Sequence, residues 1–392
     1  MKRFAIIIAL AIGTFSAYGN DVFAPVLQQI EQNSNTLQAL REQMEADKLA
    51  HQAGLAPYDP EVEFGYLWGG PAAIGNRKDI SVSQSFDFPT AYIQRSKLAD
   101  LKDSSTEYRY RTERMQLLLA AKELCIELIY NNKMREMYAV QHRNAGKILA
   151  AYETLMQSGE ANRLEYNKAS MNYATMDSEL KRIDLERERL LAELAAMNGG
   201  QPVSFDATAY TVPALPTDFE QWYAEAEAIN PSLQYLRSQV EVAGRQVKVS
   251  QAEMLPQMAV GYMGEFVAGE RFQGVTVGLS VPLWHDKHRV RQARAQALAT
   301  ASMAEDSRVQ YYNHLRSLYQ QVTALQQSTA LYASALADNG NGALLLAAYE
   351  KGQLTLLDYL IEMDYYYTCM QRQAEAEKEL AHAWAQLTAY QL

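Results

Sequence analysis

Of the six histidines, only the two in the stretch WHDKH lie close together in the sequence. His285 and His288 are three positions apart, a spacing that can serve a metal ion. They directly follow a predicted strand, so the alternative is a polar cluster where a strand joins a helix. The other histidines are scattered through the chain: His51, His142, His314 and His382. We therefore predict no metal site.

The sequence lacks the short motifs that mark common catalytic sites. It contains no HExxH, no phosphate-binding GxxxxGK[ST], no GxSxG and no CxxC. Neither an enzyme nor a cofactor is predicted. The net charge of −10 also argues against a nucleic-acid partner, because phosphate binding relies on clustered Lys and Arg.

The first 19 residues have the pattern of a secretory signal peptide. Lys2 and Arg3 precede the apolar run FAIIIALAIG, and small residues ending in Ala17-Tyr18-Gly19 predict cleavage before Asn20. No apolar run of 18 residues follows, so we expect an exported chain without a transmembrane helix. No Cys lies near the predicted cleavage point, so no lipid anchor is expected there.

Only Cys125 and Cys369 remain as thiols. A disulfide between them is possible in an oxidising compartment. Both lie in long helical patterns, however, which favours two buried thiols.

The chain repeats itself at about half its length. LQALREQ at Leu37 returns as LQYLRSQ at Leu233, 196 positions later, and PEVEFGYLWG at Pro60 returns as PQMAVGYMGE at Pro256. At a shift of about 193, QSGEANRLEYNKA meets EKGQLTLLDYLIE. Three landmarks in the same order predict a tandem duplication. We assign residues 20–199 to the first repeat, 200–217 to a Pro- and Gly-rich linker and 218–392 to the second.

Each repeat predicts the same series of elements. A helix of about 25 residues comes first, and in the second repeat Asn230-Pro231 has the pattern of its N-cap and first turn. Two strands follow, and then a helix that spans 91–157 or 288–350, the latter interrupted at 338–342. Sixty-odd helical residues extend over roughly 100 Å. A Gly-centred turn reverses the chain into a second helix, 161–198 or 354–390.

The predicted strands alternate apolar and polar residues over segments of membrane-strand length. They span 61–68, 79–88, 257–266 and 275–283. Soluble hairpins packed on a helix would show a similar alternation. Four strands, however, cannot close a barrel across a bilayer, because about eight are needed, and an open sheet edge cannot face lipid. If these strands enter a membrane, several chains must share one barrel.

In this order and spacing the chain resembles the TolC-type outer-membrane efflux family. The resemblance rests on NPSLQYLRSQ…LPQMAVGYMG and its weaker copy, on the second strands ISVSQSFDF and VTVGLSVPLW, and on the two hairpin motifs. It covers about residues 20–392. The compact length is similar to the metal-efflux branch, but Met and His are not clustered and the lipid-modified Cys of many members is absent.

The resemblance implies a mainly α protein with a membrane β part. Three identical chains would pool four strands each into a twelve-stranded barrel in the outer membrane of a Gram-negative bacterium. Their long helical hairpins would form a tunnel, an α-helical barrel, in the periplasm. The expected function is passive export of small molecules or metal ions, with a periplasmic adaptor protein, an inner-membrane efflux pump and outer-membrane lipid as partners. The alternative is a periplasmic coiled-coil adaptor or scaffold without a pore.

The family's functional positions transfer to the two hairpin motifs. Adaptor docking is expected at the hairpin tips, which are Ser158, Gly159, Glu160 and Ala161 in the first repeat and Lys351, Gly352, Gln353 and Leu354 in the second. Asp358, and Glu165 at the matching place, are candidates for an acidic gate at the periplasmic entrance. The alternative for both is a carboxylate that complements the dipole of its helix.

Aromatic residues beside the predicted strands are candidates for membrane-interface belts. These are Tyr66, Trp68, Phe88, Tyr262 and Trp284. A second group, Tyr365, Tyr366 and Tyr367, is predicted to pack between helices instead.

Overall fold

The computed structural model describes residues 21–70, 74–280, 287–337 and 341–392. The predicted signal peptide, Trp284 and His285 lie outside these ranges. Within them, no helix combines the length and the apolar character that a bilayer crossing requires.

The described chain forms two compact units, and each unit takes segments from both sequence repeats. One consists of Gln38–Arg114 and Tyr223–Asn313, and is called the sheet unit below. The other consists of the residues up to Leu37, Met115–Trp222 and His314–Leu392, and is called the tip unit because it contains both helical hairpin tips. The repeat boundaries predicted from the sequence remain a prediction.

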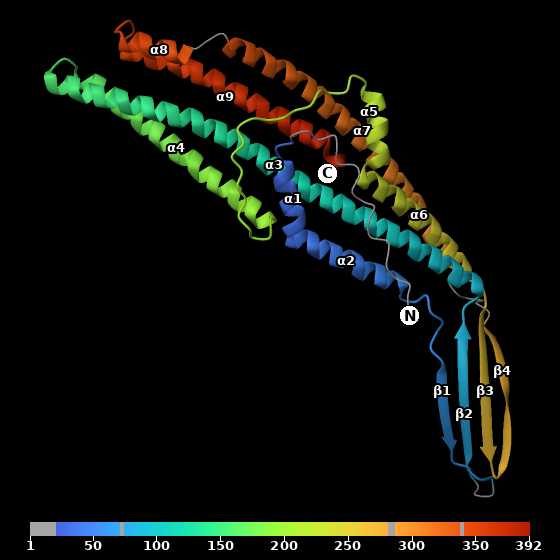
Figure 1. Cartoon of the computed structure of the whole chain (residues 1–392). Helices are drawn as coiled ribbons and strands as arrows, with labels where there is room; N and C mark the ends of the chain where they lie inside the picture. The colour runs from blue at the N-terminus through green and yellow to red at the C-terminus, as the bar shows by residue number, and fades with distance from the viewer. Residues whose placement is uncertain (1–20, 71–73, 281–286, 338–340) are drawn as a thin grey trace, which may run out of the picture. The chain divides into compact units, whose positions relative to one another are not determined.

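The sheet unit holds four antiparallel strands in the order β1-β2-β3-β4 (Figure 1). They are β1 (Glu61–Leu67), β2 (Arg77–Phe86), β3 (Gln257–Val267) and β4 (Glu270–Ser280). All four were predicted, but β2 begins two residues earlier and β4 five residues earlier than expected. The reason at β4 is a two-residue turn in which Ala268 and Gly269 both have positive φ, 49° and 90°, the backbone of a tight β-hairpin.

Two helices contain the repeated segments LQALREQ and LQYLRSQ. They are α2 (Asn35–Gln52) and α6 (Pro231–Ala252). The side chain of Asn230 accepts a hydrogen bond from the Leu233 amide at 3.1 Å, which confirms the predicted N-cap. At the matching place Ser34 accepts from the Leu37 amide at 3.4 Å. Each helix is preceded by a short one that was not predicted, α1 (Ala24–Asn33) or α5 (Phe219–Ile229).

The long helices form as predicted, and most of the predicted interruption at 338–342 lies outside the described residues. The first repeat has α3 (Pro89–Ser158) and α4 (Arg163–Met197), and the second has α7 (Lys287–Ala337), α8 (Asn341–Glu350) and α9 (Leu356–Leu387). At 70 residues α3 is on the order of 100 Å long. Since α3 and α7 begin in the sheet unit and end in the tip unit, both are shared by the two units.

The tip unit has a continuous apolar core around the middle of α3. Leu118, Ile126, Leu128 and Ile129 are nearly or fully buried there, together with residues of α1, α4 and α9. Cys125 lies in this core, and burial raises the pKa of its thiol to about 12. Cys369 is half-buried, and both thiols are free.

The three consecutive tyrosines of α9 do not share one environment. Tyr366 and Tyr367 pack among apolar side chains of the tip unit, as predicted, and burial raises the pKa of Tyr367 to about 12. Tyr365 is 72% exposed. Consecutive helical residues point about 100° apart, so Tyr365 points away from the side on which its two neighbours pack. The packing predicted for Tyr365 is therefore not found inside one chain.

Candidate functional site

One face of the sheet is apolar and exposed. Cross-strand pairing puts Val62, Val82, Tyr262 and Val275 in one row. Phe64, Ile80, Val260, Val277 and Leu279 lie in neighbouring rows on this face. Side chains on β4 are left bare, with Val277 81% exposed. An apolar face of this extent needs a cover that the described chain does not provide.

The opposite face of the sheet is mostly polar or small. Its residues include Glu61, Glu63, Asp79, Ser81, Ser83, Glu265 and Thr276. The apolar exceptions on this face are Leu67, Met263, Val267 and Phe272. The predicted alternation of apolar and polar residues is thus confirmed. The alternative, soluble hairpins whose apolar face packs on a helix, does not occur within the sheet unit.

The two outer strands each leave one edge without a backbone partner in the described chain. Pairing runs from β1 to β2, β3 and β4 and stops there. Open edges of this kind pair readily with another strand. The sheet is therefore incomplete along both edges as well as uncovered on one face.

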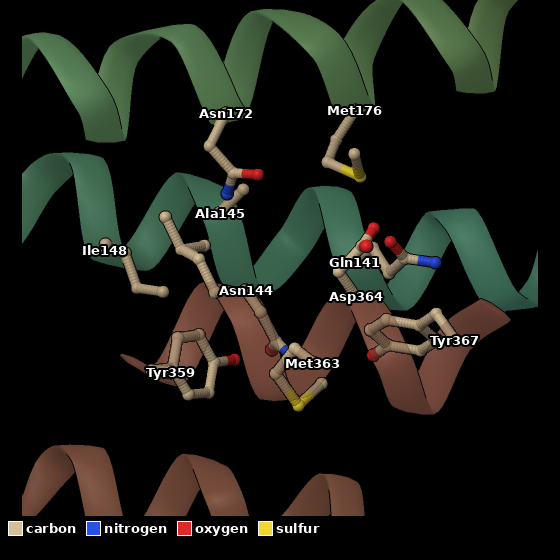
Figure 2. A pocket seen from close by; sticks show the side chains of 11 residues that line it. Gln141, Asn144, Ala145, Ile148, Asn172, Met176, Tyr359, Met363, Asp364 and Tyr367 are labelled. Atoms are coloured by element: carbon tan, nitrogen blue, oxygen red, sulfur yellow. The ribbon is translucent and has the colours of Figure 1, made fainter. Parts of the chain in front are cut away.

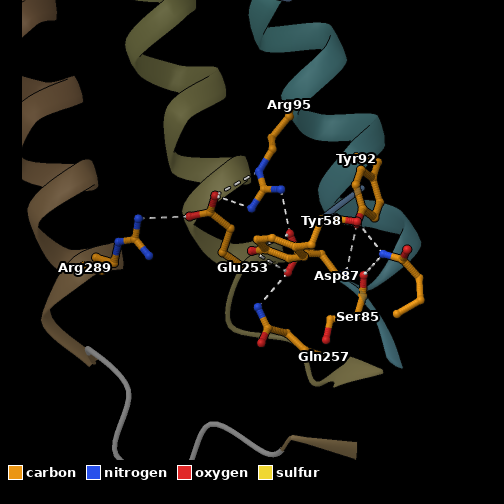
Figure 3. Close-up of polar contacts among 9 residues, drawn as sticks. Tyr58, Ser85, Asp87, Tyr92, Arg95, Glu253, Gln257 and Arg289 are labelled. Carbon is orange, nitrogen blue, oxygen red and sulfur yellow. Dashed lines mark hydrogen bonds and ion pairs between the residues drawn. The ribbon is translucent and has the colours of Figure 1, made fainter. Parts of the chain in front are cut away.

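A buried carboxylate joins the sheet to the start of α3. Asp87 follows β2 and is only 6% exposed. Arg95 donates to it at 2.6 Å, and Gln257, the first residue of β3, donates at 2.8 Å (Figure 3). The Tyr92 hydroxyl accepts from the Asp87 amide at 3.1 Å. These bonds fix both strands to α3, because a buried charge is stable only when it is paired and hydrogen-bonded.

The same network continues to α6 and α7. Arg95 also donates to Glu253, the residue after α6, at 2.9 Å. The other oxygen of Glu253 lies 3.2 Å from a guanidinium nitrogen of Arg289 (Figure 3). Residues from α3, α6 and α7 are thus tied together where the helices meet the sheet.

The two hairpin tips have matching backbone geometry. Gly159 and Gly352 occupy equivalent positions with φ of +81° and +72°, where a side chain would be strained. The amide of Glu160 donates to the Leu155 carbonyl at 2.8 Å, and that of Gln353 to the Ala348 carbonyl at 2.9 Å. The predicted tip residues form real turns that end α3 and α8.

Both candidate gate carboxylates lie in the first turn of the helix that leaves their tip. Glu165 accepts from the Asn162 amide at 3.1 Å while Asn162 accepts from the Glu165 amide at 3.0 Å, a complete capping box. Asp358 accepts from the Thr355 hydroxyl at 2.6 Å, and its amide donates back to that oxygen at 3.2 Å. The helix-end alternative is therefore realised for both, and Asp358 remains exposed.

A cluster of aromatic and apolar side chains packs beneath the tips. The rings of Tyr349 and Tyr359 stack with centroids 4.9 Å apart. Ile148 from α3, Ala169 from α4 and Met363 from α9 are buried in the same cluster. Burial raises the pKa of both tyrosines, and a hydrogen bond with Tyr152 adds to the effect at Tyr349. The cluster holds the two helical hairpins against each other.

A small hollow of about 100 Å³ lies between α3, α4 and α9. Figure 2 shows Gln141, Asn144 and Asn172 among its lining residues, beside Met176 and Tyr367. The buried amide nitrogen of Gln141 has no protein partner, so the hollow suits a few ordered waters. It is too small for an organic ligand, whose pockets measure about 300–1,000 Å³.

The predicted aromatic belt residues lie at different levels of the sheet. Tyr66 and Trp68 lie near the β1–β2 turn, and Phe88 lies at the end joined to α3. Tyr262 lies midway along β3, and its hydroxyl donates to Gln273 at 3.0 Å. The belt role stays a prediction for these four, and Trp284 lies outside the described residues.

Sequence reasoning missed the Asp87 network. No short sequence motif contains its members, which lie at positions 58, 87, 92, 95, 253, 257 and 289. The only signal in the sequence was Asp87 itself, a charged residue at the end of an alternating strand. A residue there is normally expected to face water.

The chain has clear relatives. Residues 222–391 match the family described as "Outer membrane efflux protein". Alkaline protease secretion protein AprF of Pseudomonas aeruginosa is 20% identical over 92% of this chain and 82% of its own length.

Solved structures show the same fold. CusC superposes with a TM-score of 0.76 at 14% identity, covering 96% of this chain and 95% of its own. The outer-membrane channel OprN superposes with a TM-score of 0.75 at 15% identity, covering 95% and 90%. The open MtrE channel of Neisseria gonorrhoeae gives 0.71 at 12% identity, covering 94% and 88%.

A four-stranded sheet with one bare apolar face, joined to paired long helices, is the protomer fold of an outer-membrane efflux channel. Residues 222–391 match the model of the outer membrane efflux protein family and the chain has the fold of solved efflux channels, so the TolC-type resemblance predicted from the sequence is confirmed. The comparisons favour an outer-membrane channel over the alternative of a periplasmic adaptor without a pore.

Proposed function

We propose that three copies of this chain form a passive conduit that spans the outer membrane and the periplasm. The observation that carries the proposal is the combination of two open sheet edges with a bare apolar face. Pairing β4 of one copy with β1 of the next is a head-to-tail contact, which closes into a ring when the rotation fits. Three sheets then give twelve strands with lipid outside and polar residues inside.

Exposed apolar residues on the hairpin helices support the same assembly. On α9, Leu357, Ile361 and Tyr365 follow one another at intervals of four, and each is about half exposed or more. On α4, Leu164 and Met171 are seven residues apart and more than 60% exposed. Stripes at these spacings fit helix-to-helix packing. Contact between neighbouring copies would cover them and continue the barrel as a helical tunnel.

The matching hairpin tips are the proposed docking sites for a periplasmic adaptor protein. Each is exposed at its turn and contains a Gly with positive φ. Three chains would present six near-equivalent tips in a ring. The adaptor would connect the conduit to an inner-membrane efflux pump, which supplies the energy because the conduit itself performs no chemistry.

Asp358, and to a lesser degree Glu165, are proposed to narrow and charge the periplasmic entrance. Three copies would place like carboxylates close together, which favours cations and makes passage sensitive to salt. Hydrogen bonds from the Asn162 amide to Glu165 and from the Thr355 hydroxyl to Asp358 hold each carboxylate in place on its helix. The cargo class stays open, since the pump selects it in such systems, and the curated relative carries the name of a protease secretion protein.

Single-channel recording tests the proposal. Purified mature chain added to a planar lipid bilayer should give discrete, cation-preferring conductance steps. Protein that inserts stably and yet carries no current in any salt, with or without the adaptor, would contradict the conduit.

A further inference from the structure

The apolar face of the sheet carries charge in only one row. Cross-strand pairing aligns Tyr66, Lys78, Phe266 and Arg271 across all four strands. Aromatic rings and cations therefore alternate along this row, which lies close to both β-hairpin turns. Among the described strand residues, Lys78 and Arg271 are the sole charged side chains on this face.

The carboxylates of the strands all lie on the other face. They are Glu61, Glu63, Asp79, Glu265 and Glu270. Arg77, the neighbour of Lys78 in sequence, points to that face and pairs with Asp79 at 2.8 Å and Glu265 at 3.1 Å. In the described chain Lys78 and Arg271 have no such ion pair. The Lys78 ammonium lies 6.0 Å from the centre of the Tyr66 ring, and both cations are exposed.

In the proposed barrel, this row would lie at a membrane boundary. From Lys78 to Phe86 at the other end of β2 the strand rises about 27 Å. In a strand tilted by about 40° this rise projects to about 21 Å along the membrane normal, slightly less than the roughly 25 Å apolar band of a barrel. The rows between are apolar except for Gln84 and Gln273. The two cations thus lie where hydrocarbon ends, on the side away from the helices.

We propose that Lys78 and Arg271 bind the phosphate groups of an outer-leaflet lipid headgroup. The inference rests on the proposed barrel, in which this face meets lipid and the β-hairpins point out of the cell. The two residues are separated by two strand spacings, so their Cα atoms are about 10 Å apart and flank Phe266. Two cations with an apolar ring between them suit a lipid that carries phosphate above acyl chains. Repetition in three chains gives a belt of six cations.

The test measures lipid binding to the detergent-purified trimer by native mass spectrometry. The probes are lipid A with two phosphates, lipid A with one phosphate, and phosphatidylethanolamine. Wild-type protein should bind the bisphosphorylated form most tightly. The double variant K78Q/R271Q should lose roughly tenfold or more of that affinity, since each cation near an anionic headgroup contributes severalfold. The charge-conserving variant K78R/R271K should keep it.

Arg77→Gln is the matched control, because it removes the adjacent cation from the polar face. It should leave lipid A binding unchanged. Equal affinity of wild type and K78Q/R271Q would overturn the proposal, as would equal losses in R77Q. Release of the lipid by sodium phosphate, but not by sodium chloride of equal ionic strength, would mean that any phosphate suffices and would overturn the commitment to a lipid.

The same mass spectra distinguish a failure of the lipid-binding inference from a failure of the proposed trimeric barrel. If the protein is a monomer that stays in solution without detergent, the conduit fails. A trimer that shows no preference among the three lipids retains the conduit and refutes only the phosphate belt.

Discussion

At the scale of single residues, the tip glycines depend on backbone conformation and not on contacts. A Cβ at Gly159 meets nothing within 4 Å, so the only penalty of Gly159→Ala is its φ of +81°. We expect a loss of about 1 kcal/mol of stability. Gly146 in the middle of α3 is the control, because a Cβ there makes ordinary contact with the Tyr173 ring at 3.5 Å. Thermal unfolding should show G159A below and G146A at or above wild type.

The proposed gate role of Asp358 can be separated from its place in the first turn of α9. Asp358→Asn keeps a polar side chain of the same shape at the helix start while removing the charge, so the helix should persist and cation preference should fall. Reversal potentials in a salt gradient measure that preference. Glu362→Gln, four residues further along α9 and also exposed, is the charge-matched control. If both variants select ions as wild type does, the gate role of Asp358 is wrong.

Glu127 in the tip unit links stability to pH. Hydrogen bonding from His382, followed by the charge of Lys378, holds the pKa of this carboxyl below its usual 4.5. A carboxyl with a depressed pKa stabilises the fold fully above 4.5 and loses that contribution as pH falls through the lowered value. Unfolding temperatures should therefore decline on acidification, and less steeply in Glu127→Gln. Parallel pH profiles for the two proteins would contradict this linkage.

At the scale of elements, the two faces of β2 predict opposite outcomes for neighbouring substitutions. Val82 lies in the central row of the apolar face, and Ser81 lies on the polar face. Val82→Lys should cost about 2–4 kcal/mol because it places a charge at mid-membrane depth. Ser81→Lys should be tolerated, since its side chain reaches water. The amounts of folded protein recovered in outer membranes would compare the two, and equal recovery would be inconsistent with a lipid-facing row.

The elements also show what the sequence can and cannot predict. Period-2 alternation, the tip glycines and the Asn230-Pro231 pattern are local signals, and the strands, the turns and the helix start all form where they indicate. The early start of β4 was missed because Ala268, a non-Gly residue, adopts a positive φ in the turn. The Asp87 network was missed because its partners are brought together only by the tertiary fold.

At the scale of the whole molecule, the described part of one chain leaves apolar surface and sheet edges without a partner. Its sheet has two open edges and a bare face, and its hairpin helices expose Leu164, Ile361 and Tyr365. In the proposed trimer, the predicted duplication would let three chains supply six near-equivalent structural units, in line with the shared backbone geometry of Gly159 and Gly352. In the proposed assembly, contacts between neighbouring copies cover these exposed surfaces.

The mass of the particle extracted from outer membranes tests this account most directly. Native mass spectrometry of the mature chain, released gently from detergent, measures the number of copies without assumptions about shape. The account predicts a particle of three chains that needs detergent to stay in solution. A single chain that remains soluble after the detergent is removed would contradict it.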